Sequence, residues 1–199
     1  MNLFNKIFSA KKEESTKEEG LKSIYDLENL SLDDIFVHNF IKKGGKFLYC
    51  TLQEEVNQNL LNIIDENSWD DVLCFDNDLS KLLTIIGKNG DSIIAKNKPL
   101  FTRCEHLISE NGSVLFSSNQ VQQHKIAELP SHFIVFAKTS QLVRTTSEGL
   151  MGIRKNYKKN FPTNISSIKS YMPSKVNDDF LSYGNTNAKS LYLLLLEDL

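Results

Sequence analysis

Short apolar runs alternate with longer amphipathic segments along most of this chain. Four strongly apolar runs cover residues 45–50, 72–75, 132–137 and 191–197. Each is too short for a helix, and the last is too apolar for an exposed sheet edge, so we expect strands buried on both faces. Strands of this kind, separated by helical segments, predict an α/β fold with a mixed, mainly parallel sheet flanked by helices.

Two helices are expected between the first strands. Apolar residues recur at helical spacing at Leu52, Val56, Leu60 and Ile63. Thr51 and Glu54 show the pattern of a capping box, in which each side chain accepts a hydrogen bond from a backbone amide at the helix start. Residues 79–86 predict a second, shorter helix, and residues 92–95 predict a third short strand.

The middle of the chain predicts a central β-hairpin. Two apolar runs, residues 104–109 and 113–117, are separated by Asn111 and Gly112. An Asn-Gly pair tolerates the positive φ angles that a tight hairpin turn requires. A short helix over residues 123–129, ending at a proline, is expected to follow.

A polar turn at residues 139–141 follows the third strongly apolar run. We expect a long helix over residues 140–159 to begin there, with two glycines on one side that permit a close approach or mark a break. Ligands gather at strand ends in open α/β sheets, and helix N-termini attract anions. A serine before a helix is equally typical of a cap. Ser140 and Gln141 are therefore candidates for a cap, an anion site or both.

Residues 1–20 are expected to lie apart from a single α/β domain formed by residues 21–199. Four apolar residues among the first eight predict a short helix, and the charged residues 11–20 are typical of a flexible linker. The helix is either a docking or membrane-surface element or a terminus that packs loosely on its own domain.

The composition is that of a globular protein, and it argues against membrane-spanning segments and against metal or iron–sulfur sites. The 199 residues are 40% hydrophobic and 24% charged, with a net charge of −2. No apolar run approaches the roughly 20 residues of a membrane-spanning helix, and no signal peptide is evident, so we expect a cytoplasmic protein. Cys50, Cys74 and Cys104 lie in separate apolar stretches, which predicts reduced, buried thiols. We expect no metal, iron–sulfur cluster or other cofactor.

The hairpin turn is the first candidate for chemistry. Glu110, Gly112 and Ser113 place a carboxylate, a permissive backbone position and a hydroxyl between two buried strands. Glycine lets a ligand approach the backbone, and a carboxylate there could act as base or nucleophile, so Glu110 is the tentative catalytic residue. The same residues are typical of an ordinary hairpin tip.

Polar turns in the last third supply further candidate ligand-binding residues. Thr163, Asn164 and Gly184 fit either ligand contact or ordinary loops. Residues 138–175 hold eight basic residues against one acidic residue, so this segment faces an anionic ligand, an acidic partner or water. Few aromatic residues lie between the basic ones, and we therefore expect no nucleic-acid binding.

Several of these features occur together in one known protein family. The turn from Glu110 to Ser113, the Leu129-Pro130 pair and the apolar strand headed by His132 resemble the LUD domain of the lactate-utilisation protein C type. That family has a glutamate–any–glycine–threonine turn, then a leucine–proline pair and a histidine-headed hydrophobic strand. The resemblance extends over roughly residues 36–199.

This chain departs from the family pattern at two places. Ser167 and Lys169 stand where the family has an acidic pair, and Tyr183 stands where it has a histidine in the closing turn. If those groups hold a ligand in other members, this chain either binds something different or has lost that site.

The resemblance implies a sheet similar to that of sugar-phosphate isomerases and CoA transferases, and a role beside iron–sulfur proteins that oxidise L-lactate to pyruvate. Because the chain lacks cluster ligands, it would be a non-redox accessory component with those proteins as partners. Two alternatives stay open. One is a CoA-transferase or cyclo-ligase type of enzyme that uses Glu110, and the other is a non-catalytic regulator that binds a small anion.

Overall fold

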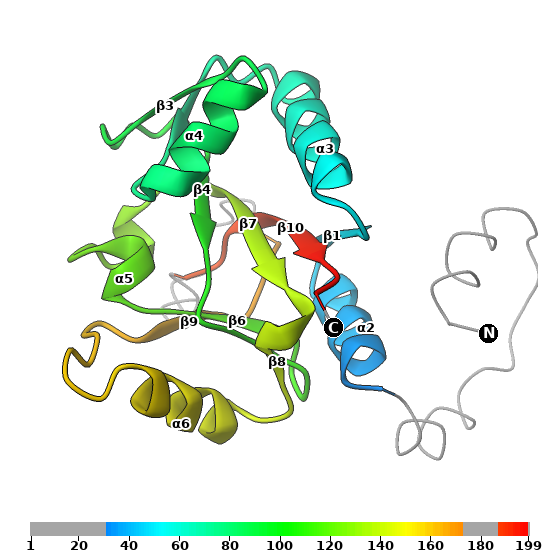
Figure 1. Cartoon of the computed structure of the whole chain (residues 1–199), viewed down its shortest axis with the longest axis vertical. Coiled ribbons are helices and arrows are strands. Elements are labelled where there is room, and N and C mark those ends of the chain that lie inside the picture. Colours follow the sequence, from blue (N-terminus) through cyan, green and yellow to red (C-terminus); the bar gives the residue numbers. More distant parts are fainter. Residues whose placement is uncertain (1–30, 173–186, 199) are drawn as a thin grey trace, which may run out of the picture.

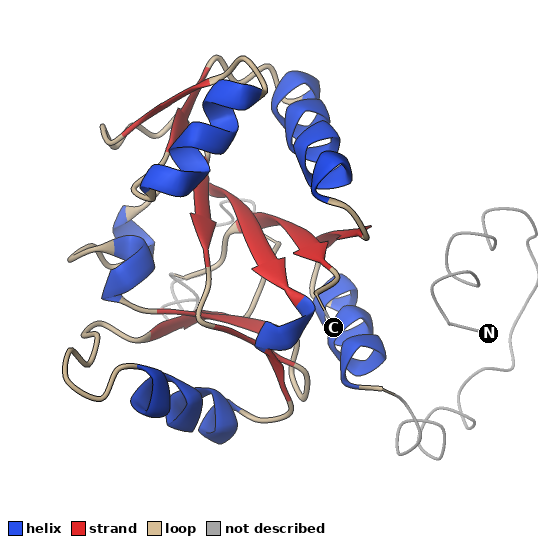
Figure 2. Ribbon diagram, in the orientation of Figure 1, coloured by secondary structure: helices blue, strands red, loops and turns tan. Residues whose placement is uncertain are grey.

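The computed structural model describes residues 31–172 and 187–198. These residues form two β-sheets, with helices on the outer sides (Figures 1 and 2). The helix and linker predicted for residues 1–20 lie outside the described residues, as does Gly184.

The main sheet has six strands, and every neighbouring pair is parallel. In spatial order its strands are β1 (Lys46–Cys50), β10 (Ser190–Leu196), β7 (His132–Lys138), β4 (Leu100–Arg103), β2 (Asp71–Leu73) and β3 (Asn89–Asp91). The two most apolar strands, β7 and β10, are neighbours inside the sheet, with Leu193 opposite Val135. The predicted buried parallel strands are thereby confirmed.

Each face of the main sheet has its own apolar core. Helices α3 (Gln53–Glu66) and α4 (Asn77–Ile85) cover one face, where Leu60 and Leu83 pack into the same core as Ile134. Helix α2 (Leu32–Lys42), for which the sequence suggested no element, packs with the second sheet on the other face. Its fully buried Phe36 and Phe40 rings stack 5.4 Å apart.

The second sheet contains the predicted hairpin. Its four strands, in spatial order, are β8 (Leu142–Val143), β5 (His106–Ile108), β6 (Ser113–Phe116) and β9 (Ser166–Ile168). β5 and β6 are antiparallel, and Gly112 in the turn between them has the predicted positive φ, at 62°. The hairpin therefore belongs to a separate mixed sheet and not to the main one, which is wholly parallel.

Helix α6 (Thr146–Asn156) covers the outer face of the second sheet (Figure 1). Two glycines of α6 face this sheet. A Cβ atom on Gly149 would lie 3.1 Å from Ile108 Cδ1, and one on Gly152 would lie 2.6 Å from His106 Nε2. Of the two interpretations of these glycines, close approach is therefore confirmed.

The long helix predicted over residues 140–159 was wrong at its start. Residues Thr139–Gln141 form a 3-10 turn, η3, and Leu142 and Val143 then pair with β5 as strand β8. The α-helix begins only at Thr146, after Thr145 accepts a hydrogen bond from the Glu148 amide at its Oγ1. A pairing between distant segments thus replaced the helix that local periodicity favoured.

Three shorter predictions also need correction. Glu55, not Glu54, accepts hydrogen bonds from the amides of Thr51 and Leu52, because α3 begins at Gln53. The strand expected over residues 92–95 lies earlier, at Asn89–Asp91. The helix expected over residues 123–129 is replaced by α5 (Ser118–Val121) and the 3-10 turn η2 (Ile126–Glu128).

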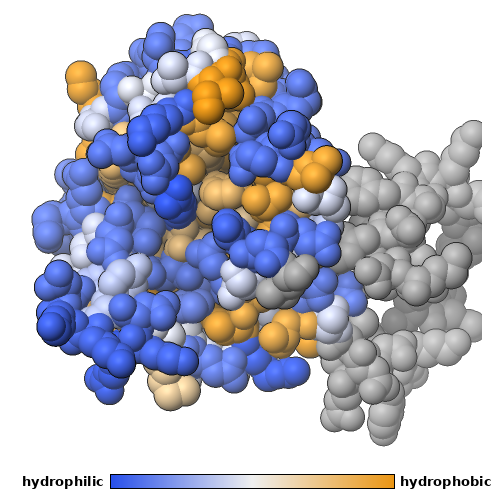
Figure 3. Space-filling view, in the orientation of Figure 1, coloured by the Kyte–Doolittle hydropathy of each residue, from blue (hydrophilic) through white to orange (hydrophobic). Residues whose placement is uncertain are grey.

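The described helices are all too short or too polar to cross a membrane. Seen in the orientation of Figure 1, the surface is mostly hydrophilic, with hydrophobic residues near the centre of the view and in smaller groups at its top and lower edge (Figure 3).

Candidate functional site

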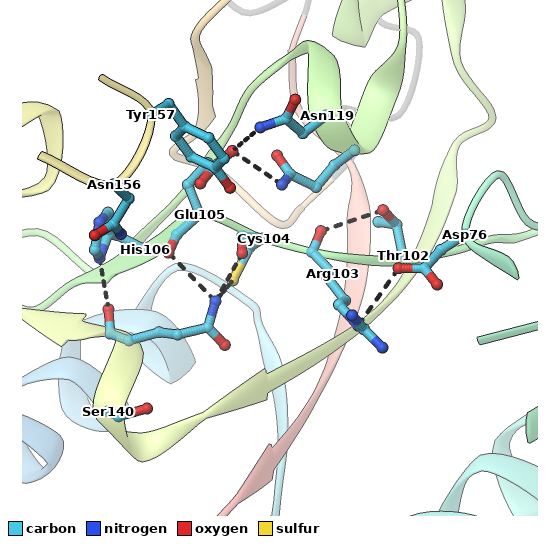
Figure 4. Close-up of a pocket in the computed structure, with 12 residues that line it drawn as sticks. Asp76, Thr102, Arg103, Cys104, Glu105, His106, Asn119, Ser140, Asn156 and Tyr157 are labelled. Carbon is cyan, nitrogen blue, oxygen red and sulfur yellow. Dashed lines mark hydrogen bonds and ion pairs between the residues drawn. The ribbon is translucent and has the colours of Figure 1, made fainter. Parts of the chain in front are cut away.

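A cavity of about 510 Å³ opens where strands of the main sheet reach their carboxyl ends. β4 ends at Arg103 beside it, and the chain leaving β7 contributes Ser140 and Gln141. Ligands bind outside the carboxyl ends of strands in open parallel sheets, and this volume lies within the usual range of small-molecule sites. The lining residues are Asp76, Thr102, Arg103, Cys104, Glu105, His106, Asn119, Gln120, Ser140, Gln141, Asn156 and Tyr157 (Figure 4).

The cavity lies where the chain crosses twice from the main sheet to the second sheet. Cys104 and Glu105 connect β4 to β5, and η3 connects β7 to β8. Gln141 joins the two crossings, because its Nε2 donates to the Cys104 carbonyl at 2.7 Å and lies 3.3 Å from the Glu105 carbonyl. Its Oε1 accepts a hydrogen bond from the Lys138 amide at 2.8 Å.

Glu105 is a buried carboxylate in the cavity wall, with only 7% of its surface exposed. Its Oε1 accepts hydrogen bonds from Ser117 Oγ at 2.5 Å, Asn119 Nδ2 at 3.2 Å and Gln120 Nε2 at 3.0 Å. All three donors are neutral, and Glu105 forms no ion pair with any residue that the structure describes. Burial, followed by the nearby Glu105 charge, raises the pKa of the Tyr157 phenol, which therefore stays protonated.

Arg103 supplies a cation on another side of the cavity, away from Glu105 (Figure 4). Its Nε lies 3.4 Å from Asp76 Oδ2, its Nη2 lies 3.9 Å from Asp78 Oδ2, and its side chain is 44% exposed. A guanidinium carries five N–H donors in a planar fork. Two such long contacts leave donors that can bind a carboxylate or phosphate in the cavity.

His106 and Cys104 are two further residues of the cavity wall that could take part in chemistry. The His106 Nδ1 atom lies 3.2 Å from the Gln141 carbonyl oxygen, so Nδ1 carries a proton and donates it. Burial, followed by the Glu105 charge, raises the pKa of the Cys104 thiol, which makes it a poor nucleophile at neutral pH. Nowhere in residues 31–172 and 187–198 do three or more potential metal ligands gather.

A second cavity of about 390 Å³ lies on the other side of Ser140. It is lined by Leu32, Asp33, Tyr49, Thr139, Ser140, Leu142 and Glu197. Burial and the Glu197 carboxylate raise the pKa of Tyr49 to about 12. The turn η3 therefore forms part of the walls of both cavities.

The structure places Ser140 and Gln141, two of the predicted ligand-binding residues, in the first cavity. Ser140 already holds an anion of the chain itself. Its amide donates to Asp198 Oδ1 at 2.9 Å, and its hydroxyl donates to Asp198 Oδ2 at 2.8 Å. The Thr139 hydroxyl also donates to Asp198 Oδ1, at 2.9 Å. These donors of the turn are therefore engaged by the Asp198 carboxylate, and a contact of Ser140 or Gln141 with a ligand stays a prediction.

Glu110, Gly112 and Ser113 lie at the hairpin turn and line neither of these two cavities. Glu110 Oε1 accepts hydrogen bonds from the Thr146 amide at 3.1 Å and hydroxyl at 3.2 Å, at the start of α6. Gly112 packs against α2, where a Cβ atom would lie 2.5 Å from the Phe40 amide nitrogen. Ser113 is 1% exposed. A catalytic role for Glu110 stays a prediction.

Thr163 and Asn164 hold a loop beside α5. The Thr163 amide donates to Ser118 Oγ at 3.0 Å, and Asn164 Nδ2 donates to the His124 carbonyl at 2.6 Å. Neither residue lines the two cavities, and their predicted ligand contacts stay untested. The sequence reasoning missed Arg103, Glu105 and His106, although polar residues directly after an apolar strand are a usable signal.

Comparison with solved structures first defines the class of fold. The chain is similar to a DUF162 family protein from Deinococcus radiodurans, whose crystal structure was determined at 1.70 Å resolution. The match has a TM-score of 0.59 and covers 85% of this chain and 99% of that chain. At 13% identity the likeness shows the fold alone.

The family follows from the sequence. The LUD domain family model matches residues 91–196, which is more than half of the chain, so the chain belongs to the LUD domain family. This family is associated with lactate utilisation in general. The resemblance noted at the hairpin turn is thereby confirmed. No curated protein matches the sequence.

Proposed function

We propose that this chain is a non-redox accessory component of L-lactate or related 2-hydroxy acid utilisation that binds a small carboxylate in the cavity beside Arg103. The observation that carries this proposal is the polar cavity at the carboxyl ends of the parallel strands. It contains a guanidinium with unused donors, which matches the planar geometry of a carboxylate. Membership of the LUD domain family supports the substrate class.

The electron-transfer role belongs to partner proteins in this proposal. A cubane or two-iron cluster is usually held by four cysteine thiolates. These 199 residues contain three cysteines, each of which is a buried free thiol. Iron–sulfur proteins of lactate oxidation are therefore the proposed partners, and this chain would supply substrate binding or assembly.

The acyl-transfer alternative gains no support from the surroundings of Glu110. A carboxylate nucleophile needs a ligand beside it. Glu110 instead accepts two hydrogen bonds at the start of α6 and lies outside the cavity wall. Its contacts favour a role in fixing the helix to the hairpin.

Ligand binding can be tested with the purified chain by isothermal titration and by thermal unfolding with L-lactate. Ligand at 100 times its Kd should stabilise the protein by about 2.7 kcal/mol. For a chain of this size this corresponds to a rise in Tm of roughly 5–11 °C. Arg103→Gln should weaken binding at least about tenfold, because removing one partner of a charged hydrogen-bonded pair costs more than 1.4 kcal/mol.

Arg154→Gln is the matched control, because Arg154 is exposed on α6 and does not line the cavity. It should bind L-lactate as the unchanged chain does. Equal losses in both variants would show a general effect of positive charge and contradict a site at Arg103.

The partner proposal needs a separate experiment. The tagged chain is purified anaerobically from its native cells grown on L-lactate, and the eluate is assayed for lactate-dependent dye reduction. Co-purifying iron–sulfur proteins and activity that is lost when this chain is removed are expected. A solitary chain, with unchanged lactate oxidation in cells that lack it, would refute the accessory role.

A further inference from the structure

A smaller cavity lies at the opposite edge of the main sheet from the site beside Arg103. Its volume is about 240 Å³, and its walls come from residues 94–96, residues 127–131 and Lys189. These three segments lead into β4, β7 and β10, so the cavity lies at the amino ends of three neighbouring strands. In Figure 1 the arrowheads of β4 and β7 point away from this edge, toward the second sheet.

Lys189 is a buried cation in the wall of this cavity, with only 5% of its surface exposed. Its Nζ donates to the Leu129 carbonyl at 2.7 Å. The centroid of the Phe133 ring lies 5.9 Å from Nζ, at the outer limit of a cation–π contact. Lys189 forms no ion pair with any carboxylate in residues 31–172 and 187–198.

This arrangement leaves the Lys189 ammonium group short of partners. An ammonium has three N–H donors, and the Leu129 carbonyl takes one of them. A buried charge is costly unless it is paired and hydrogen-bonded, and lysines are almost never fully buried without a partner. Burial accordingly lowers the pKa of Lys189. An anion that enters the cavity would supply the missing charge and accept the remaining hydrogen bonds.

The rest of the wall favours a small oxyanion. Lys96 adds a second positive charge, which is exposed and forms no ion pair within the described part of the chain, and Ser131 adds a hydroxyl donor. The wall also contains Glu128, but its Oε2 accepts a hydrogen bond from the Lys125 amide at 3.1 Å, at the start of η2. The volume lies below the roughly 300–1,000 Å³ of ordinary small-molecule pockets, so the cavity suits an inorganic anion better than an organic ligand.

We propose that Lys189 binds a small oxyanion, such as inorganic phosphate, in this cavity at the amino edge of the main sheet. The site is independent of the proposed function, because it shares no lining residue with the cavity beside Arg103. Leu129 and Lys189 precede the neighbouring strands β7 and β10. A bound anion would therefore stabilise the amino ends of the two most apolar strands of the protein.

The test is isothermal titration of potassium phosphate into the purified chain, in potassium chloride of matched ionic strength. Saturable binding is expected. Lys189→Met keeps the apolar stem and removes the charge. It should weaken binding at least about tenfold, because truncating one partner of a buried, hydrogen-bonded charge pair is costly. Lys96→Gln should weaken binding only about threefold, because exposed ion pairs contribute little.

Lys125→Gln is the matched control. Lys125 is exposed, belongs to the same connection before β7 and does not line the cavity. The substitution also leaves the backbone amide that donates to Glu128 in place. This variant should bind phosphate as the unchanged chain does. An equal loss in all three variants would show a general effect of positive charge and overturn the proposal.

Two other results would also overturn the proposal. One is the absence of saturable phosphate binding to the unchanged chain. The other is a Kd that neither Lys189→Met nor Lys96→Gln changes, since the phosphate would then lie elsewhere. If Lys189→Met does not fold, Lys96→Gln decides the question, because an exposed side chain can be replaced without disturbing the core. None of these outcomes bears on L-lactate binding beside Arg103.

Phenyl phosphate provides a test of size that needs no variant. Its ring adds bulk that a cavity of about 240 Å³ should not accommodate together with the phosphate group. It should therefore bind more weakly than inorganic phosphate. Tighter binding of phenyl phosphate would show a site for an organic ester and contradict a site for the free anion.

Discussion

The contact between Gly152 and His106 predicts that Gly152→Ala destabilises the protein when His106 is present and stabilises it when His106 is replaced by alanine. Gly152 lies in the middle of α6, and its missing side chain leaves room for the imidazole ring of His106. A Cβ atom there would lie 2.6 Å from His106 Nε2 and 3.0 Å from Cε1. The ring cannot turn freely, because its Nδ1 donates to the Gln141 carbonyl.

Two opposing effects determine how Gly152→Ala changes the free energy of unfolding. Alanine in place of glycine favours a helix interior by about 1 kcal/mol. Overpacking against a held side chain costs roughly 1–3 kcal/mol. We therefore expect a net loss of about 1 kcal/mol in the free energy of unfolding, with a fall in Tm of about 2–4 °C.

The second background isolates the clash. In a His106→Ala chain the ring is absent, so Gly152→Ala should stabilise by about 1 kcal/mol through helix propensity alone. Urea unfolding of the four chains gives a coupling energy, which should be about 2 kcal/mol. If Gly152→Ala stabilises both backgrounds equally, the ring moves aside without cost and the packing argument is wrong.

Three further predictions concern a buried tyrosine, the three cysteines and Asp198. Tyr171→Phe removes the hydroxyl that donates to the Gly112 carbonyl at 2.6 Å, so it should lower the free energy of unfolding by about 1–3 kcal/mol; unchanged urea unfolding would contradict this. Burial raises the pKa of all three thiols, to about 11 for Cys74, so a thiol-specific dye should label none of them in the native chain and three after denaturation. Burial alone would raise the pKa of Asp198, but hydrogen bonds from Ser140 and Thr139 outweigh this effect and lower the pKa below its ordinary value. The ionised Asp198 therefore stabilises the fold above its unfolded pKa, and this stabilisation is lost as the pH falls through the folded pKa. The difference in unfolding free energy between the unchanged chain and Asp198→Asn should accordingly be larger at pH 7 than at pH 2.5, and a constant difference would exclude this linkage.

The sequence predicted those parts of the fold that depend on local chemistry or on burial from both sides. Strands β7 and β10 consist of nearly continuous apolar residues, and only the interior of a parallel sheet buries both faces of such a strand. Gly112 predicted the hairpin because the turn needs a positive φ. These signals are contained in a few neighbouring residues.

The errors arise where distant segments decide the structure. Leu142 and Val143 lie in the segment predicted to be a helix, yet they pair with Leu107 and Ile108 of β5 and become a strand. The edge strand β3 contains Gly90 and no large apolar residue, so it gives no strand pattern of its own. Its conformation depends on pairing with β2, which local propensity does not include.

Only two residues that line the candidate cavity, Ser140 and Gln141, were named from the sequence, because the cavity also depends on contacts between distant segments. Ser140 and Gln141 were found because they follow an obvious strand. Arg103 and Glu105 were hidden beside Cys104, which made residues 104–109 look like one apolar strand. In the structure the chain changes sheets between Arg103 and His106, and that crossing places the polar side chains in a cavity wall.

The double crossing beside Gln141 also has a mechanical consequence. Residues 103–106 and residues 138–142 each connect the main sheet to the second sheet. The side chain of Gln141 links these two segments through its hydrogen bonds. Because residues from both sheets line the cavity, its width depends on how the two sheets are placed relative to each other. A change in the packing of α6 against the hairpin, where Gly152 contacts the lining residue His106, is therefore expected to alter the space available to a ligand.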